Sequence, residues 1–522
     1  MKNNIIISLI SFSFIVFGCQ STEMEDLHAI DNRKVELSPK ELLSVQYESA
    51  PELSQTEMYN LLEAFQAKDI NKQNTRALSQ PTSFSINSKY YLSRDNIKKN
   101  HSSTRSVLGD GMQIPIYEIK IKSGENNGIA IVSGDRRAPH ILAYIDKIKD
   151  NDTISAAPNT LLQWGEMYIR NEVKAFDEIK DSLYASATSK ISKELMIPVS
   201  DIKFNDIKDQ LTIQIPATRS KVVEEVPSNL KIITAVLPMC PVTWGQWEPY
   251  NCMLPEGNCE KFFPGYIEKS NYPAGSGVVA IAHLMAYLEP HLKRSRRNSG
   301  GSVTTDRRSY GSTRRTEASN RSSSRPSSSI SWTYLTENKE IKAPDYFNAG
   351  DPVEKRQMVG NIFDEIYYET YSHTVTNSKG VITGSTCTVS EIESYINYIF
   401  DCSSKKKWDI NVIKNSLKAL EPILVYGKPD NKPSDGVYPF IIDGLKECRG
   451  RIDNVPYDVN VNYIHANFGF GSGYQDGYYL MDIEKTTITF ETTIPLIFKD
   501  NALTMIANIK NKSTSRRSQT TN

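Results

Sequence analysis

The sequence lacks a long apolar run after its first residues, and this argues against a membrane-spanning helix in the body of the chain. The run near the start, Ile5 to Phe17, covers about 13 residues and follows Met1-Lys2. That is the length of a signal-peptide core, and it is too short to cross a bilayer as a helix. We therefore predict that residues 1–18 are an export signal and do not belong to the fold.

The chain also has no formal net charge at pH 7. The chain has 61 Lys plus Arg and 61 Asp plus Glu, so its overall charge does not favour nucleic acid or an anionic membrane surface as a partner. With 39% hydrophobic residues and 27 Tyr, the composition is that of a globular protein of mixed or β-rich type. Its 522 residues are too many for one ordinary domain and predict about two to four.

Neither a Cys-x-x-Cys motif nor a Cys/His spacing typical of zinc sites is present, so no metal and no cofactor is expected. Six cysteines follow residue 19, and structural cysteines, buried or disulfide-bonded, are the favoured interpretation. Cys252 and Cys259 are the nearest candidates for a pair, although connectivity does not follow from sequence. The six are Cys240, Cys252, Cys259, Cys387, Cys402 and Cys448.

The apolar run ends in Val16-Phe17-Gly18-Cys19, which resembles a bacterial lipobox. Cys19 would then carry the lipid, and residues 19–39, which are polar and acidic, would form a flexible tether. The pattern predicts an exported lipoprotein, anchored by lipid alone to a bacterial membrane at the outer membrane or cell surface. Ordinary signal cleavage nearby, with Cys19 incidental, is the alternative.

Residues 40–225 alternate helical and strand patterns, which predicts a small α+β unit. Two alternating runs joined by a Gly/Asn turn, residues 115–135, predict a hairpin, and residues 159–183 have the apolar spacing of one long amphipathic helix. The charged, irregular stretch that follows is typical of an exposed linker. We place the linker at residues 226–233, in a stretch with basic sites that a protease could cut.

A second unit, residues 234–500, has helical patterns before antiparallel strand patterns, which is typical of an α+β domain. A polar tail, residues 501–522, follows. The helical patterns cover residues 353–372 and 388–401, and the strand patterns cover residues 422–427, 437–445, 459–471 and 477–483.

Residues 293–328 interrupt this second unit with a basic, Ser-rich insertion. Ten Lys or Arg stand against Asp306 and Glu317 in a Ser/Gly/Thr background, so we predict disorder. An arm that binds RNA or another polyanion and a protease-sensitive loop are two functional interpretations. A solvated insertion is favoured, because Tyr310 is the sole aromatic residue there that could stack on a base.

A turn followed by a buried helix begins at residue 271, in "NYPAGSGVVAIAHLMAYLEP". Pro273, Gly275 and Gly277 set the turn, and apolar residues then recur until Pro290 stops the run. Many hydrolases hold a nucleophile at such a loop-to-helix junction. Here the residue at the junction is Ser276.

Four segments of the second unit occur in the order and spacing of one peptidase family. They are "WGQWEPYN", the helix "AGSGVVAIAHLMAYLEP", the strand "GVYPFIIDGL" and the glycine-rich "HANFGFGSGYQDGYYLMD". The sequence therefore resembles the streptopain-type cysteine peptidases, a bacterial branch of the papain-like fold. Residues 40–225, with "GIAIVSGDRRAPHILAYID" and "LLQWGEMY", resemble the Spi-type inhibitory prodomain of this family. The resemblance covers nearly all of residues 40–500 and implies an α+β, papain-like peptidase fold preceded by a small α+β prodomain.

Two positions depart from the family pattern, and they are those of the catalytic pair. Ser276 stands at the position of the nucleophilic Cys, and Tyr438 at that of the catalytic His. A thiol has a reference pKa near 8.5 and becomes a thiolate beside an imidazolium and a helix N-terminus, whereas a hydroxyl needs a strong base to remove its proton. A phenol, with a reference pKa near 10, cannot move protons as imidazole does. The resemblance therefore implies a catalytically degenerate member, in which both residues are non-catalytic.

The other family positions are kept. Gln246 corresponds to the oxyanion-hole glutamine and Asn467 to the asparagine that orients the histidine. A substrate-binding rim would consist of Gly469, Phe470, Gly471, Ser472 and Gly473, and Phe468 and Phe470 replace two tryptophans of the family.

Neither nearby histidine is expected to substitute for the missing one. His465 has a counterpart in the family besides the catalytic residue, so we predict a structural or rim role. His283 is seven residues after Ser276, which is about 10 Å along a helix and out of hydrogen-bond reach.

Three functions remain open. The chain is predicted to be a pseudopeptidase that binds a peptide or protein partner, because a cysteine-type endopeptidase needs the pair that is missing. The alternatives are an active endopeptidase zymogen that hydrolyses peptide bonds through an unconventional site, and an inhibitor that acts in trans through its prodomain. The expected partners are a bacterial membrane, through the lipid anchor, and a peptide or protein ligand. Neither nucleic acid nor metal is expected to bind.

Overall fold

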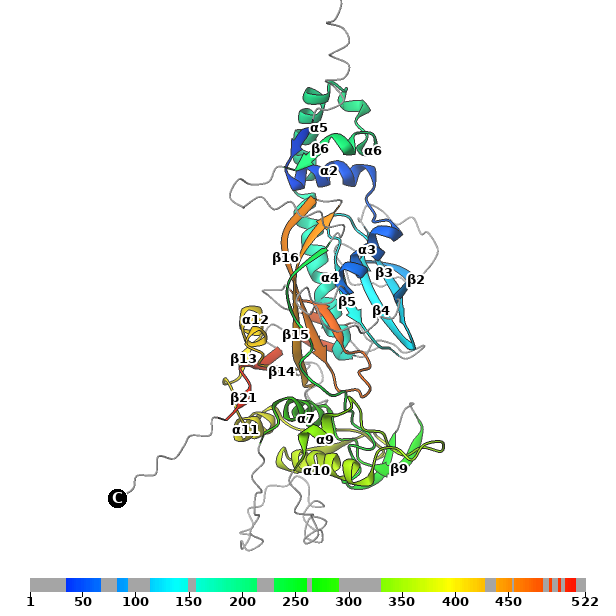
Figure 1. Cartoon of the computed structure of the whole chain (residues 1–522), viewed down its shortest axis with the longest axis vertical. Helices are drawn as coiled ribbons and strands as arrows, with labels where there is room; N and C mark the ends of the chain where they lie inside the picture. Colours follow the sequence, from blue (N-terminus) through cyan, green and yellow to red (C-terminus); the bar gives the residue numbers. More distant parts are fainter. Residues whose placement is uncertain are drawn as a thin grey trace, which may run out of the picture. The chain divides into compact units, whose positions relative to one another are not determined.

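The structure is a computed structural model of the chain, in which two compact units are described (Figure 1). The first unit comprises Met1–Ala235, Leu445–Ile464 and Gly477–Glu484, and the second comprises Val236–Gly444, His465–Asp476 and Lys485–Asn522. Within them the described residues are 34–66, 82–92, 113–148, 156–213, 230–260, 265–290, 330–427, 438–452, 455–481, 488–490, 496–498 and 503–512.

The first unit contains an antiparallel sheet with the strand order β16-β17-β5-β4-β3-β2. Helix α4 (Ala156–Asp177) packs against β5 and β17, as Figure 1 shows for β5, and α3 (Gln55–Gln66) precedes the sheet in sequence. The strands are β2 (Thr82–Leu92), β3 (Ile114–Ser123), β4 (Asn126–Ser133), β5 (Ile141–Ile145), β16 (Val455–Asn467) and β17 (Gly477–Leu480). Residues 114–133 form the predicted hairpin, because β3 pairs with β4 from Ser123 opposite Asn126, and Gly124 between them has φ 61°.

A second, mainly helical part of the first unit has its own apolar core. Helices α2 (Pro39–Ser49) and α5 (Lys180–Leu195) pack around Leu42, Val45 and Ile191. The parallel strands β1 (Val35–Leu37) and β6 (Leu211–Ile213) lie beside them, with α6 (Phe204–Ile207) and two short 3₁₀ helices, η1 (Val199–Asp201) and η2 (Lys208–Gln210).

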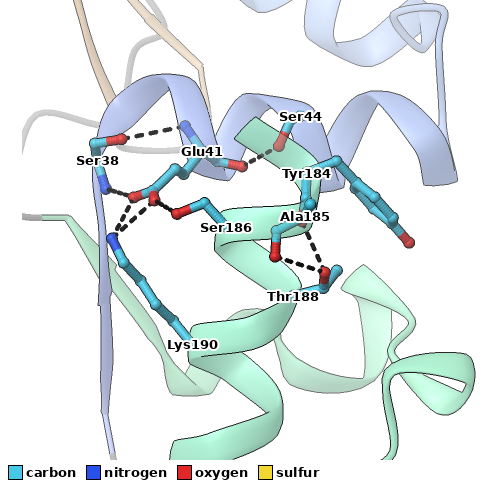
Figure 2. Close-up of polar contacts among 8 residues, drawn as sticks. All are labelled: Ser38, Glu41, Ser44, Tyr184, Ala185, Ser186, Thr188 and Lys190. Atoms are coloured by element: carbon cyan, nitrogen blue, oxygen red, sulfur yellow. Dashed lines mark hydrogen bonds and ion pairs between the residues drawn. The ribbon is translucent and has the colours of Figure 1, made fainter. Parts of the chain in front are cut away.

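A buried carboxylate, Glu41, joins α2 to α5 (Figure 2). Ser38 and Glu41 form a capping box at the start of α2, which satisfies amides that have no partner within the helix. The Lys190 ammonium donates to both Glu41 carboxylate oxygens at 2.8 Å, and the Ser186 hydroxyl donates at 2.7 Å. Burial alone would raise the pKa of Glu41, but these donors outweigh it and lower the pKa to about 2.

The prediction of one long helix over residues 159–183 is wrong. α4 ends at Asp177 and α5 begins at Lys180, with the hydrogen bond from Ile179 N to Phe176 O closing the break. The reason is that α4 packs on the sheet whereas α5 packs on α2, so the two apolar stripes face different cores.

The second unit combines helices with mainly antiparallel strands, in agreement with the predicted α+β class, and its longest strand follows the last helix. Helix α7 (Ser276–Leu288) lies beside α9 (Trp332–Thr336) and α10 (Val353–Glu369) (Figure 1). All of its residues from Gly277 to Ala286 are buried, so it is a core helix without a polar face. Helices α11 (Val389–Ile399) and α12 (Ile410–Lys418) follow.

The strands of the second unit form a sheet with the order β13-β20-β14-β15 and a smaller one with the order β10-β11-β8-β9. β14 pairs antiparallel with the start of β15, with Val425 opposite Phe440. The bounds are β8 (Glu256–Glu260), β9 (Ile267–Asn271), β10 (His373–Thr376), β11 (Ile382–Thr386), β13 (Lys406–Lys407), β14 (Ile423–Gly427), β15 (Phe440–Ile452) and β20 (Leu503–Ile506). The remaining strands are β7 (Leu230–Val236), β12 (Phe400–Asp401), β18 (Ile488–Phe490), β19 (Leu496–Phe498) and β21 (Lys510–Asn511).

All six described cysteines are free, so the candidate pair of Cys252 and Cys259 is not formed. The Cys252 thiol lies 3.6 Å from Arg356 O and the Cys259 thiol 3.7 Å from Ser270 O, so each has its own backbone neighbour. Of the helices that the structure describes, none is long and apolar enough to cross a membrane. The signal segment, Cys19, residues 226–229 of the linker and the basic insertion lie outside the described residues.

Candidate functional site

Ser276 is the first residue of α7, where a loop turns sharply into the helix. Gly275 before it has φ 88° and ψ 148°, and a β-carbon at Gly275 would lie 2.5 Å from Ser385 O. This residue therefore has to be glycine for two reasons, the backbone angle and the close approach of the neighbouring strand. The half-buried Ser276 side chain is thus placed at the end of the helix where backbone amides lack helical partners.

Gln246 is held close to this helix start by its own backbone. The Ala274 amide donates to Gln246 O at 3.0 Å, two residues before Ser276. The preceding Trp244 is fully buried and pairs with Tyr250 and Phe363, which fixes the loop to α10. The sequence-predicted oxyanion residue and nucleophile position are therefore brought together by the fold.

Tyr438 reaches the same place from the sheet. It stands two residues before β15, and its amide donates to Gly427 O of β14 at 3.1 Å. A β-carbon built on Gly277 would lie 3.5 Å from Pro439 Cγ, so the segment carrying Tyr438 packs against the residue after Ser276.

The rim loop, Gly469–Gly473, closes over the first turn of α7. Asn467 Oδ1 accepts a hydrogen bond from Gly469 N at 3.1 Å, and Asp476 Oδ1 accepts one from Phe468 N at 2.8 Å. Gly469 has φ 68°, and a β-carbon there would lie 2.5 Å from Val279 Cγ1. These bonds and close approaches leave little freedom in the loop.

A second set of contacts joins the rim loop to the loop of Gln246. Ser472 N donates to Thr243 O at 2.9 Å, and a β-carbon on Gly245 would lie 2.9 Å from Gly471 Cα. Phe468 is buried, and its ring stacks on that of Phe470, which is 39% exposed, with ring centroids 5.8 Å apart. All five predicted rim residues therefore lie beside the other site positions.

The two histidines nearest to the site in sequence are held by other groups. His465 Nδ1 lies 2.6 Å from Asp443 Oδ1 in a buried pair, and Asp443 Oδ2 also accepts the Cys240 amide at 3.0 Å. His283 is buried, with Nε2 3.1 Å from Trp244 O. Burial lowers the pKa of His283 to about 4, so this imidazole is neutral at pH 7.

A thiol that sequence reasoning did not connect with the site lies beside the helix start. A β-carbon on Gly277 would lie 2.9 Å from the Cys387 sulfur, which comes from the residue before the Thr388 N-cap of α11. Cys387 is buried, and that burial raises the pKa of its thiol to about 11. It is therefore a protonated thiol at neutral pH and not a ready nucleophile. Nothing in the local pattern could have revealed it, because its proximity depends on tertiary packing.

The arrangement brings the backbone of Gln246 to the helix N-terminus at Ser276 and brings the segment with Tyr438 to the same helix start. A helix N-terminus and a glutamine can stabilise negative charge on oxygen, but a neutral phenol is not a group that takes a proton from a hydroxyl. No group of three or more His, Cys, Asp or Glu that could hold a metal occurs in the part of the chain that the structure describes.

Comparison with known family models supports a peptidase-like protein. Residues 244–479 match the model of the Peptidase C10 family. A solved structure of active wild-type Prevotella intermedia interpain A cysteine protease is similar at 16% identity, with 55% of this chain and 98% of that chain covered and a TM-score of 0.31. A search of curated proteins found no match.

Proposed function

We propose, from the premise that residues 244–479 belong to the Peptidase C10 family, that this chain is a pseudopeptidase. Its peptidase-like domain would bind a peptide or protein and leave peptide bonds intact. The observation that carries the proposal is the identity of two residues: Ser276, a hydroxyl at the helix start, and Tyr438, a phenol in the segment that packs against the next residue of the helix.

The loss of cleavage follows from proton transfer. Attack by a hydroxyl requires a base in hydrogen-bond reach, and a neutral phenol is not one at pH 7. His283 is buried with Nε2 on Trp244 O, and His465 Nδ1 is paired with Asp443. Among the described hydrogen bonds, none joins Ser276 to either imidazole, so we propose that neither takes the place of the family's histidine. The buried Cys387 thiol does not replace the missing thiolate, because burial keeps it protonated.

Retained features support binding. Gln246 and the amides at the start of α7 could donate hydrogen bonds to a carbonyl oxygen of a ligand. The donors would be those of an oxyanion hole, but no reaction would follow. The rim loop has positive φ angles at Gly469, Gly471 and Gly473, and its close contacts with Val279 and Gly245 hold its backbone beside the helix start. A ligand with an extended backbone, a peptide or a protein segment, fits this surface best.

We also propose that the chain is an exported lipoprotein and that residues 40–225 act as a Spi-like prodomain. The lipobox-like segment ending in Cys19 supports the first statement and the motif resemblance supports the second. Labelling of cells with a fatty-acid analogue should mark the wild-type chain, and Cys19→Ser should abolish both the label and recovery with membranes. A labelled Cys19→Ser chain would contradict the lipid site.

The direct test of the pseudopeptidase proposal is hydrolysis of casein. The purified chain should release no acid-soluble peptides, and Ser276→Ala should change nothing. Hydrolysis that Ser276→Ala abolishes would instead identify an active endopeptidase. If the whole chain inhibits a related active peptidase when titrated against it, the inhibitor function is favoured.

Restoring the reactive pair tests whether the rest of the site still works. Ser276→Cys combined with Tyr438→His should give thiol-dependent cleavage at least about tenfold above either single variant. The same variant with Gln246→Ala should lose about a hundredfold in rate, because the oxyanion donor is gone. Adding Cys387→Ser controls for capture of the new thiol as a disulfide. A folded restored variant without activity would show that the groove no longer holds a substrate productively.

A further inference from the structure

Two late stretches of the chain belong to the same compact unit as the N-terminal region. We call Leu445–Ile464 and Gly477–Glu484 the returning segments, and residues 34–213 the N-terminal region. Strand β17 of the returning segments pairs antiparallel with β5, with Gly477 opposite Ile145 and Tyr479 opposite Ala143. β17 is also hydrogen-bonded to β16, so it lies between strands from distant parts of the sequence.

The fit along this strand pair is close. A β-carbon on Gly477 would lie 2.4 Å from Tyr144 O, so glycine is required for β17 to approach β5. Helix α4 packs against both strands. The N-terminal region and the returning segments therefore share backbone hydrogen bonds and a covering helix.

One side chain of the N-terminal region is inserted among aromatic rings of the returning segments. Phe65, near the end of α3, is fully buried, and its ring centroid lies 4.8 Å from that of Tyr463 and 5.7 Å from that of Tyr478. The Tyr144 ring of β5 completes the cluster at 5.5 Å. Both contacts with the returning segments are edge-to-face, which is favourable for aromatic pairs.

A buried lysine closes the same cluster. Lys446, 8% exposed, donates from Nζ to Phe65 O at 2.6 Å, which satisfies a carbonyl at the end of α3. Its ammonium lies 4.3 Å from the Phe65 ring centroid and 4.7 Å from that of Tyr478. The Phe65 carbonyl and ring therefore help to stabilise a largely buried charge.

We propose that the returning segments are a docking surface whose occupant is the N-terminal region of the same chain, and that they hold it after the intervening chain is cut. Separation would leave two unpaired strand edges, expose the Phe65 cluster to water and take the Phe65 carbonyl and ring away from the Lys446 ammonium. Cleavage in the predicted linker would therefore produce a two-fragment complex and would not release a prodomain. This inference goes beyond the proposed function and stands whether or not Ser276 reacts.

The test is a full-length chain with a site-specific protease sequence inserted between residues 225 and 226. After complete cleavage, the two fragments should elute together in size-exclusion chromatography and stay together on dilution to about 10 nM. Fragments that elute separately at micromolar concentration would overturn the inference. Denaturing electrophoresis verifies that the cut is complete.

Matched variants show which residues contribute to the affinity between the two cut fragments. Phe65→Ala should weaken the association of the cut fragments at least about a hundredfold, and Lys446→Met about tenfold or more. Phe84→Ala is the control, because the Phe84 ring pairs with Tyr59 inside the N-terminal region, and it should change the affinity less than threefold. Circular dichroism verifies that each variant is folded. If Phe65→Ala does not fold, Lys446→Met decides, and folded variants with wild-type affinity would contradict the proposed surface.

Discussion

The two units use buried polar groups in different ways. The first unit buries the ion pairs of Arg137 with Asp135 and Asp177, at 2.5 and 2.7 Å, and buries the Glu41 carboxylate, whose partner Lys190 is partly exposed. The candidate site of the second unit, beside the buried pair of His465 and Asp443, is shaped mainly by glycines at close backbone approaches and by hydrogen bonds within loops. The difference indicates that ion pairs fix the architecture of the first unit, whereas steric fit keeps the shape of the site although its reactive pair is changed.

Among the substitutions that test this difference between the units, Arg137→Ala is expected to cause the largest loss of stability. This residue is 2% exposed, and its guanidinium binds both carboxylates and lies 4.7 Å from the centre of the Tyr47 ring. Arg137→Ala leaves buried carboxylates without a cation and should lower the free energy of unfolding by about 3–5 kcal/mol. Urea denaturation of the first unit measures it.

The control is Lys89→Ala, which removes a solvent-accessible ion pair with Glu52 at 2.7 Å. Its cost should be below about 1 kcal/mol, because water screens such pairs. Equal losses for the two variants would mean that burial does not distinguish these ion pairs.

The second-largest loss of stability is expected from a substitution that disturbs the steric fit of the rim loop. Gly469→Ala forces a left-handed backbone on alanine and places its methyl 2.5 Å from Val279 Cγ1, so we expect a loss of about 2–4 kcal/mol. Gly380→Ala has the same backbone problem at φ 74° but meets no atom within 4 Å, and should cost only about 1 kcal/mol. Thermal unfolding of both variants separates clash from backbone strain. Equal shifts in Tm would refute the proposed tight contact.

The sequence predicts elements better than it predicts the contacts between them. The hairpin at residues 114–133 and the start of α7 could be predicted because alternation, turn glycines and apolar runs are local signals. The break between α4 and α5 could not be predicted, because the apolar spacing continues through it in the sequence. The two helices nevertheless pack against different apolar cores, which only the tertiary structure shows. The same holds for the Cys387 thiol beside Gly277 and for Phe65 among the returning segments, because both depend on residues more than a hundred positions apart.

A smaller loss of stability, which depends on pH, is expected from substitution of Glu41 in the first unit. Its pKa in the folded protein is lowered from 4.5 to about 2, so its carboxylate stabilises the fold fully above pH 4.5, and that contribution is lost as pH falls toward 2. Glu41→Gln should therefore cost about 1.5–3 kcal/mol at pH 7 and much less near pH 2.5. Urea titrations at the two pH values measure the difference. A cost independent of pH would mean that packing, and not charge, is the contribution of Glu41.

The smallest expected effect is at Ser276, although it occupies the most conspicuous position of the site. The Ser276 side chain is only half-buried and takes part in none of the described side-chain hydrogen bonds, so Ser276→Ala should change the free energy of unfolding by less than about 0.5 kcal/mol. An alkyl fluorophosphonate, which labels activated serines, should add no mass at this residue, because a neutral phenol at Tyr438 does not activate a hydroxyl as the family's histidine would activate its nucleophile. The double variant Ser276→Cys with Tyr438→His is the matched positive sample, and iodoacetamide should label its new thiol quickly at neutral pH. A phosphonylated Ser276 in the wild-type chain would show that a base reaches the hydroxyl after all, and the site would then have to be regarded as reactive.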